Sequence, residues 1–287
     1  MKTLLGIIAS PRKLGNSELF VRELCRQLSG EWKLELARLS DLDIGSCRGC
    51  YGCLLAEDGC PLKDDFRSVL EALVWADAYV VAAPTYLLSC HASLKRFLDR
   101  TLCVYRCVDD LWGKPAVAVA VAGKNGMEGY SKLVVENFVK VLLGDLRGSA
   151  VVYGALPGEI FLQNEAKETA KSLAHALVHG KERDVDVPVC PLCGGDTFRF
   201  LPNNELRCML CSSSGRYDWD DSRLQCHIEL GENHAAFLSY EAAKRHGDDL
   251  KAMKEDFKTK GQELKAITAR YSEAVSWIRS DKTKDKK

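Results

Sequence analysis

The chain of 287 residues lacks a net charge, a long apolar run and the glycine signatures of common nucleotide-binding loops. Its 40 basic residues balance its 40 acidic residues, so no overall field attracts nucleic acid or anionic lipid. No apolar segment is long enough to span a membrane, so a membrane partner is not expected. The apolar run near the start stops at Ser10 without a small-residue cleavage pattern, which argues against a signal peptide.

Cysteine, in contrast, is abundant, with 13 residues in all. Eight of them fall into two compact groups that suit metal ligation better than disulfide bonding. The other five are scattered and are expected to be reduced thiols: Cys25, Cys90, Cys103, Cys107 and Cys226. This usage predicts a reducing, cytoplasmic setting.

The first cysteine group is a C-x2-C-x2-C-x6-C run made of Cys47, Cys50, Cys53 and Cys60. Thiolates at the short spacing can bind adjacent irons of a small cluster, and the longer arm lets the chain reach the remaining iron. Three glycines within the run allow tight turns around such a cluster. Structural zinc sites usually come as two separated C-x2-C pairs, so the run favours a [4Fe–4S] cluster, with zinc or plain thiols as the alternatives.

The second group has that separated pattern, in the pairs Cys190 with Cys193 and Cys208 with Cys211. A short β-like stretch, Thr197–Leu206, lies between the pairs. Two thiolates from each pair can form a tetrahedral four-sulfur site. The spacing leaves zinc, which we prefer, and a single rubredoxin-like iron both open. The expected role is structural, because so small a ribbon lacks a core of its own.

Residues 1–182 alternate short apolar strands with amphipathic helices. The expected strands are Leu4–Ala9, Leu34–Leu39, Ala78–Ala83, Ala116–Ala122 and Ala150–Tyr153. The expected helices are Ser17–Leu28, Phe66–Trp75, Ala92–Leu102, Tyr130–Leu143 and Glu165–His179. This alternation predicts an α/β fold with a doubly wound, parallel, five-stranded sheet. Ligands of such folds bind beyond the carboxyl ends of the strands.

Three loops leave those carboxyl ends. The first, Ser10–Ser17, offers hydroxyls, an amide and a glycine at the start of a helix, which suits a terminal phosphate held by backbone N–H groups. It has neither G-x-G-x-x-G nor G-K-[ST], which argues against a dinucleotide or a P-loop, although its polar residues also suit a simple helix cap. The second, Ala83–Leu88, has a proline and a tyrosine that can frame a planar ring. The third, Gly123–Gly129, lets backbone amides approach a ligand.

Three motifs, in this order, resemble the NADPH-dependent FMN reductase family of flavodoxin-like proteins: Ile8–Ser17, Ala83–Tyr86 and Leu94–Arg100. The cysteine run followed by Asp64-Asp65-Phe66 resembles the iron–sulfur flavoprotein branch. The resemblance covers residues 1 to about 180 and implies FMN as a cofactor, with the strand order 2-1-3-4-5.

The resemblance also assigns residues to the flavin. Those expected to hold the FMN phosphate are Ser10, Arg12, Asn16 and Ser17. Those expected to contact the isoalloxazine ring are Pro84, Thr85, Tyr86 and Leu87, and those expected to border its pyrimidine side are Gly123, Lys124 and Gly126. The branch is usually oligomeric, so a dimer or tetramer is expected, with the cluster of one subunit near an FMN of another. The chain departs from the family at Cys90-His91, where small residues are frequent.

Beyond a polar linker, Arg183–Pro188, we expect a metal-bound ribbon over residues 189–230. Its few basic residues argue against nucleic-acid binding, and its segment Tyr217–Glu229 predicts one further strand. Residues 232–280 are expected to be helical, because apolar residues between Leu250 and Ile278 follow a three–four spacing that Lys260 interrupts. That stripe suits either packing on its own subunit or a dimer contact. Residues 281–287 are an expected disordered tail.

These features predict an electron-transfer flavoprotein without an acid–base catalytic residue, because a flavin handles one or two electrons and a [4Fe–4S] cluster handles one. Ferredoxin or another small redox carrier is the expected donor, and the acceptor is open. The first alternative is an NAD(P)H-dependent FMN or quinone reductase whose cysteine loop is structural. The second is a non-catalytic protein that binds partners through its ribbon and C-terminal helix.

Overall fold

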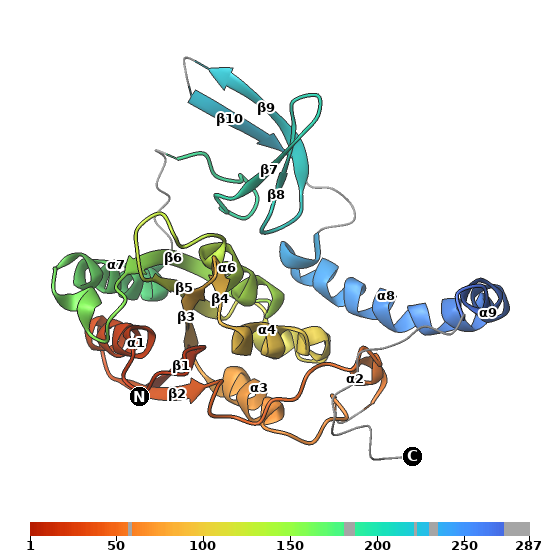
Figure 1. Cartoon of the computed structure of the whole chain (residues 1–287), viewed down its shortest axis with the longest axis horizontal. Coiled ribbons are helices and arrows are strands. Elements are labelled where there is room, and N and C mark those ends of the chain that lie inside the picture. Colours follow the sequence, from red (N-terminus) through yellow and green to blue (C-terminus); the bar gives the residue numbers. More distant parts are fainter. Residues whose placement is uncertain (57–58, 181–186, 221–222, 230–234, 273–287) are drawn as a thin grey trace. The chain divides into compact units, whose positions relative to one another are not determined.

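The computed structural model describes residues 1–56, 59–180, 187–220, 223–229 and 235–272. Its main sheet has five parallel strands: β1 (Lys2–Ile8), β2 (Trp32–Arg38), β3 (Ala78–Tyr86), β5 (Pro115–Ala122) and β6 (Asp145–Tyr153). Their order is β2-β1-β3-β5-β6, and the short β4 (Ser89–Cys90) pairs antiparallel with the end of β3 (Figure 1). The predicted doubly wound sheet and its strand order are confirmed.

Helices cover both faces of this sheet. One face carries α1 (Asn16–Gln27) and α7 (Glu165–His179), which contact each other. The other face carries α3 (Phe66–Trp75), α4 (Ala92–Leu98) and α6 (Ser131–Val141) (Figure 1). Side chains alternate between the faces, so in β1 Leu4 and Ile8 join one core while Leu5 and Ile7 join the other. Both faces of the sheet are therefore buried, which explains why the sequences of its strands are almost continuously apolar.

Two predicted boundaries in this part were wrong. The helix expected to reach Leu102 ends at Leu98, and a 3-10 turn, η1 (Thr101–Arg106), follows it, with α5 (Val108–Leu111) beyond. Arg100 lies between α4 and this 3-10 turn, and its guanidinium donates to Cys60 of the cysteine loop. The last strand begins at Asp145 rather than Ala150, because β6 is an edge strand whose first residues are partly polar and half-buried.

The ribbon is a four-stranded antiparallel sheet: β7 (Phe198–Leu201), β8 (Glu205–Cys208), β9 (Ser214–Asp220) and β10 (Arg223–Ile228). Its order is β10-β9-β8-β7. The single strand expected over Tyr217–Glu229 was wrong. Its first residues are the end of β9, and its later residues form β10, which pairs antiparallel with β9. Leu206, Leu210 and Ile228 are buried beside the ribbon cysteines in a small apolar cluster, and Leu133 and Leu146 of the α/β part pack against it.

The C-terminal segment contains η3 (Ala235–Phe237), α8 (Tyr240–Thr259) and α9 (Gly261–Ala269). The chain divides into two compact units, Met1–Gly247 and Asp248–Lys287. Within the first unit, the start of α8 packs on the α/β part, where Lys244 pairs with Asp109 at 2.7 Å. The region between Tyr240 and Ala269 is helical, but the single long helix expected there is divided at Lys260, where only an interruption of the apolar stripe was expected.

Other expectations for these segments lie outside the described residues. They include the disordered tail 281–287, the stripe residues Ala274 and Ile278, and most of the linker Arg183–Pro188. Among the described helices, none has the length and apolarity needed to cross a membrane.

Candidate flavin cleft and thiol sites

A cleft of about 190 Å³ lies at the carboxyl edge of the main sheet. Its lining comes from the ends of four strands: Ser10, Arg12, Gly15, Asn16, Ser17, Pro84, Thr85, Tyr86, Val121, Gly123, Gly154 and Ala155. Most of the residues expected to bind FMN therefore meet in one place, as the topology requires. Leu87, Lys124 and Gly126 are not part of this lining.

The phosphate-type loop is fixed by its own side chains. Asn16 donates from Nδ2 to the carbonyl of Gly154 at 2.9 Å and accepts at Oδ1 from the N–H of Gly158 at 2.7 Å. Arg12 donates from its guanidinium to the carbonyl of Ala155 at 3.0 Å. These bonds tie the loop after β1 to the loop after β6, so Asn16 and Arg12 shape the cleft as well as line it.

Glu18, in the first turn of α1, forms a hydrogen bond with the same loop. Its buried carboxylate accepts hydrogen bonds from the N–H of Leu14, at 2.9 Å, and from the guanidinium groups of Arg22 and Arg38. Burial alone would raise the pKa of Glu18, but the bonds from Arg22 and Leu14 and the charge of Arg38 lower it below its ordinary value. Leu14 itself has a φ of 53°, so this bond holds a strained turn.

The loop after β6 was missed in the sequence. Gly154 is packed so closely that an added Cβ would lie 2.8 Å from Ile160 and 3.2 Å from Asn16 Nδ2. Gly158 adopts a φ of 84°, which favours glycine. The available signal was Gly154, directly after the last apolar strand, with Gly158 four residues further on, because all the parallel strands end at the same edge.

The second loop forms a tight hairpin between β3 and β4. Thr85 Oγ1 donates to Ser131 Oγ at 2.9 Å, and the ring of Tyr86 meets His91 edge-on at 5.3 Å. Leu87 and Leu88 turn the hairpin with positive φ values, and Leu87 is 99% exposed. An apolar side chain in this position is available to a ring or to another surface.

The departure at Cys90-His91 has a structural explanation. Cys90 donates from Sγ to the carbonyl of Ser131 at 3.3 Å, and burial raises its pKa to about 12. His91 accepts at Nδ1 from the N–H of Ser93 and so caps α4, and burial lowers its pKa. Both residues join the hairpin to neighbouring helices.

The third loop packs against that hairpin. The N–H of Tyr130 donates to the carbonyl of Leu88 at 3.0 Å. Gly129 has a φ of 54°, and an added Cβ would lie 2.2 Å from the same carbonyl oxygen. Only Gly123 of this loop reaches the cleft lining among the residues expected there.

The cysteine run forms a loop between β2 and α3 that contains the short helix α2 (Gly52–Leu55). Gly49 and Gly59 adopt positive φ values, as does Tyr51. Cys47 and Cys50 are exposed, whereas Cys53 and Cys60 are half-buried. Burial, and then the neighbouring Cys60, Cys47 and Cys50, raise the pKa of Cys53. Four soft donors on one short loop suit an iron–sulfur cluster.

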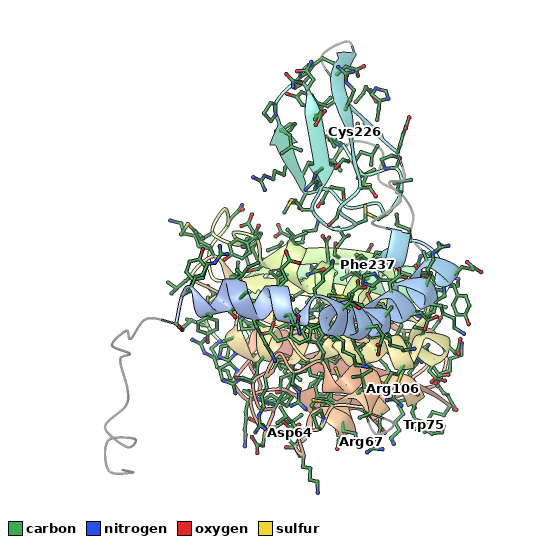
Figure 2. The ribbon with its side chains drawn as sticks, turned by 90° about the vertical axis from the view of Figure 1, so that its right-hand side faces the viewer. Asp64, Arg67, Trp75, Arg106, Cys226 and Phe237 are labelled. Atoms are coloured by element: carbon green, nitrogen blue, oxygen red, sulfur yellow. The ribbon has the colours of Figure 1, made fainter. Side chains whose placement is uncertain are left out.

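A buried ion pair joins the base of this loop. Asp64 lies just before α3, while Trp75 lies at the far end of that helix (Figure 2). The carboxylate of Asp64 pairs with Arg100 and accepts a hydrogen bond from the N–H of Gly45 at 2.9 Å. Burial would raise the pKa of Asp64, but the hydrogen bond from Arg100 lowers it. The two ends of the cysteine loop are thus held together.

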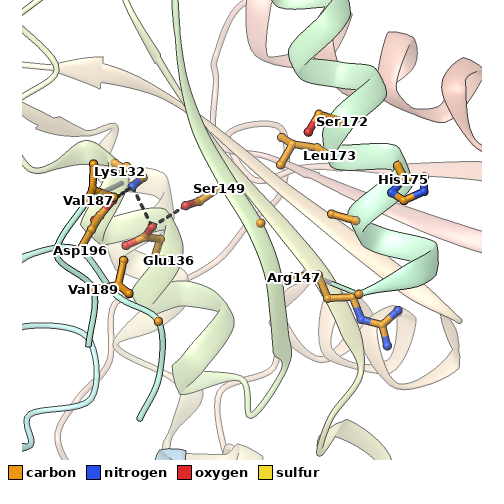
Figure 3. Close-up of a pocket in the computed structure, with 14 residues that line it drawn as sticks. Lys132, Glu136, Arg147, Ser149, Ser172, Leu173, His175, Val187, Val189 and Asp196 are labelled. Atoms are coloured by element: carbon orange, nitrogen blue, oxygen red, sulfur yellow. Dashed lines mark hydrogen bonds and ion pairs between the residues drawn. The ribbon is translucent and has the colours of Figure 1, made fainter. Parts of the chain in front are cut away.

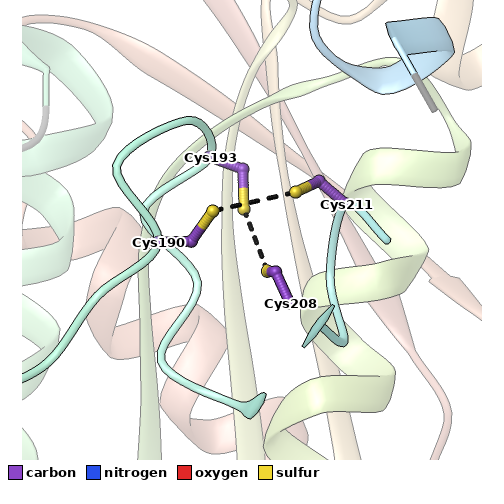
Figure 4. Close-up of side chains that lie close together, drawn as sticks. All are labelled: Cys190, Cys193, Cys208 and Cys211. Atoms are coloured by element: carbon purple, nitrogen blue, oxygen red, sulfur yellow. Dashed lines mark hydrogen bonds between the residues drawn. The ribbon is translucent and has the colours of Figure 1, made fainter. Parts of the chain in front are cut away.

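The ribbon cysteines converge on one point (Figure 4). The sulfurs of Cys190 and Cys211 lie 3.8 Å apart, and those of Cys193 and Cys208 lie 3.5 Å apart. A tetrahedral zinc with Zn–S bonds of about 2.3 Å requires sulfurs separated by about 3.8 Å, so the geometry fits a single ion.

The two thiol groups differ in compactness. All four ribbon sulfurs lie within 4.8 Å of one another, and within the described part of the chain no other group of three or more ligand side chains is as tight. The loop sulfurs are therefore spread more widely than a single ion requires.

A further cavity, of about 380 Å³, lies beside the edge strand β6 (Figure 3). Ser149 donates a hydrogen bond to the buried carboxylate of Glu136. The ammonium group of Lys132 lies 3.5 Å from the same carboxylate and also pairs with Asp196 of the ribbon. Burial raises the pKa of Glu136. This network joins α6 to the ribbon.

Comparison with known proteins places the chain in a family. Residues 2–144 match the sequence model described as NADPH-dependent FMN reductase. An iron–sulfur flavoprotein of Methanocaldococcus jannaschii is 32% identical over 181 residues, which are 59% of this chain and 92% of that protein. An iron–sulfur flavoprotein of Archaeoglobus fulgidus is 31% identical over 161 residues, which are 54% of this chain and 70% of that protein.

A solved structure named flavone reductase has the same fold, with a TM-score of 0.69 at 16% identity, over 96% of this chain and all of that one. One family assignment fits the flavodoxin-like sheet, the cleft at its carboxyl edge, the cysteine run and the relatives. The chain therefore belongs to the NADPH-dependent FMN reductase family, within its iron–sulfur flavoprotein branch, and is a flavin-dependent oxidoreductase.

Proposed function

We propose that this protein transfers electrons between a one-electron donor, such as ferredoxin, and FMN, and from FMN to an acceptor whose identity is open. The observation that carries the proposal is the position of the cysteine loop. It follows β2, which neighbours β1 in the sheet, and Ser40 Oγ donates to the carbonyl of Ser10 at 3.1 Å. The loop that carries the four thiols thus leaves the same edge of the sheet as the loops that line the cleft.

Ser10, Ser17 and the backbone around them are the groups that would hold the FMN phosphate. Ser10 accepts at Oγ from the N–H of Arg12 at 3.2 Å, so its hydroxyl hydrogen is free to donate to an anion. Ser17 is buried at the start of α1, where helix N–H groups favour negative charge. Arg12 adds positive charge, and Asn16 holds the opposite wall in place.

The other cleft residues would orient the ring and exclude water. Pro84, Thr85 and Tyr86 line one wall, and Gly123 lines the next. Lys124, Gly126 and Leu87 lie outside the cleft lining and would reach a ring only at its outer border. FMN would supply one- and two-electron chemistry, and a [4Fe–4S] cluster on Cys47, Cys50, Cys53 and Cys60 would supply single electrons.

The ribbon site is proposed to hold zinc, with a single iron as the alternative. Support comes from sulfur separations that match one tetrahedral ion and from the small size of the ribbon core. Its proposed role is to stabilise the ribbon.

A second subunit is proposed to cover the cleft. Exposed apolar side chains gather on the hairpin and the loop packed against it: Tyr86, Leu87, Leu88, Met127 and Tyr130. Such a patch beside a redox cofactor suits a symmetric contact that shields the flavin from solvent. We propose a dimer, or a tetramer built from dimers.

An NAD(P)H-dependent FMN or quinone reductase is the second candidate, and the family description favours it. The non-catalytic alternative is not supported, because the chain belongs to an oxidoreductase family. Stopped-flow reduction under anaerobic conditions separates the two candidates. The proposal predicts fast bleaching of bound flavin by reduced ferredoxin and slow bleaching by NADH or NADPH, and the opposite ranking would contradict it.

A further inference from the structure

Arg100 is a buried cation that the proposed flavin contacts do not use. Its side chain is 1% exposed, and that of its partner Asp64 is 8% exposed. A buried charge is costly unless it is paired and hydrogen-bonded, so its place in the fold calls for a reason. The family motif Leu94–Arg100 ends at this residue, and the flavin cleft does not include it.

The Arg100 side chain makes polar contacts with the cysteine loop and with its two ends. One terminal nitrogen pairs with Asp64 and lies 3.4 Å from the carbonyl of Gly45, which precedes the first cysteine. The other donates to Cys60 Sγ at 3.3 Å. The guanidinium also stacks on the ring of Phe66, 4.4 Å from its centre, which fixes the plane of the group.

We propose that Arg100 is a positioning residue for the cluster: it holds Cys60 in place and favours the reduced state of the cluster. Reduction adds one negative charge, and both a nearby cation and an N–H bond to a ligating sulfur stabilise that charge. Asp64 orients the guanidinium and partly offsets its charge. The inference rests on the cluster assigned to the loop under the proposed function.

The reduction potential of the cluster, followed by electron paramagnetic resonance during a redox titration, tests this inference. Replacing Arg100 by Met should shift the one-electron equilibrium toward the oxidised cluster about tenfold, which is about 59 mV for a one-electron couple. Replacing Asp64 by Asn should shift it in the opposite direction, because the remaining cation is less compensated. A purely structural role predicts no such pair of opposite shifts.

Lys95→Met is the matched control. Lys95 lies on α4, is 70% exposed and pairs with Asp99, so its replacement removes the same charge without touching the loop. Its potential should equal that of the wild type. Arg100→Lys keeps the charge but lacks the planar fork, so it should retain most of the potential and lose part of the iron.

Full cluster content with wild-type potentials in both Arg100→Met and Asp64→Asn would overturn the inference. If Arg100→Met binds no iron, the positioning role is supported, and Asp64→Asn still decides the potential. Iron loss of equal size in Lys95→Met would overturn the positioning role.

A measurement on cluster-free protein separates this inference from the proposed function. Trypsin can cut the loop at Arg48 and Lys63, both of which are exposed. Arg100→Met should be cut at these sites several times faster than the wild type and Lys95→Met. Equal rates would overturn the hold of Arg100 on the loop, whereas a wild-type protein that never binds iron would refute the proposed function alone.

Discussion

At the scale of single residues, polar side chains in the cleft serve two purposes. The amide nitrogen and the amide oxygen of Asn16 both form hydrogen bonds with the loop after β6. The hydroxyl of Thr85 donates a hydrogen bond to Ser131. The sequence identified both as ligand candidates from their place after a strand. It could not show these internal bonds, because their partners come from segments 46 to 142 residues away.

Replacing Asn16 by Ala should weaken FMN binding about tenfold or more, since two hydrogen bonds of about 1 kcal/mol each are lost from the wall of the cleft. Flavin fluorescence during titration of the FMN-free protein measures this. The control is Asn164→Ala, because Asn164 makes no cap bond with its side chain at α7. Equal affinities of Asn16→Ala and the wild type would contradict the assignment.

Glu18 should make the FMN-free protein sensitive to acid. Its pKa in the folded state lies below the ordinary value of 4.5. Its stabilisation is therefore complete above the unfolded pKa and is lost as the pH falls through the folded pKa. Glu18→Gln should be less stable at pH 7 by roughly 1–3 kcal/mol and should lose less further stability on acidification than the wild type.

Urea unfolding at neutral and acidic pH measures this difference. Glu71→Gln serves as the control, because Glu71 belongs to an exposed ion pair on α3. An acid loss in Glu18→Gln as large as in the wild type would show that another carboxyl controls it.

At the scale of elements, the sequence predicted the fold well where burial leaves a strong pattern. The central strands are buried on both faces, so their apolar runs mark where they lie, although β3 continues three residues beyond the expected end at Ala83. The edge strand β6 and the hairpin β9–β10 carry polar residues on exposed faces, so their bounds were wrong or missed. Arg100 shows the same limit, because its burial depends on Asp64, which precedes a different helix.

The ribbon should depend on its metal. Cys208→Ser removes one of four ligands, so the ribbon should open and be cut faster by proteases between Pro188 and Tyr217. The flavin spectrum should stay unchanged. Cys226→Ser, which alters a half-buried ribbon thiol outside the four-sulfur group, is the control. Lost flavin reduction in Cys208→Ser with FMN still bound would instead place this metal in the electron path.

At the scale of the whole molecule, the exposed hairpin should form a subunit contact. Leu87 is 99% exposed beside the cleft, so Leu87→Lys should weaken the oligomer and raise the rate at which oxygen reoxidises the flavin. Light scattering and reoxidation kinetics measure the two effects. Trp75→Lys is the control, since Trp75 is also exposed but lies where α3 leads into the amino end of β3. A wild-type protein that is monomeric with full cofactor content would rule out the contact.

One chain is expected to hold both FMN and, on the Cys47–Cys60 loop, an iron–sulfur cluster. Iron, sulfide, zinc and FMN analysis of anaerobically purified wild type and Cys50→Ala tests it most directly. About four irons and four sulfides are expected on the loop in the wild type, by the stoichiometry of a [4Fe–4S] cluster. Cys50→Ala should lose them and keep its FMN. Zinc or no metal at these cysteines in the wild type would rule out the iron–sulfur cluster.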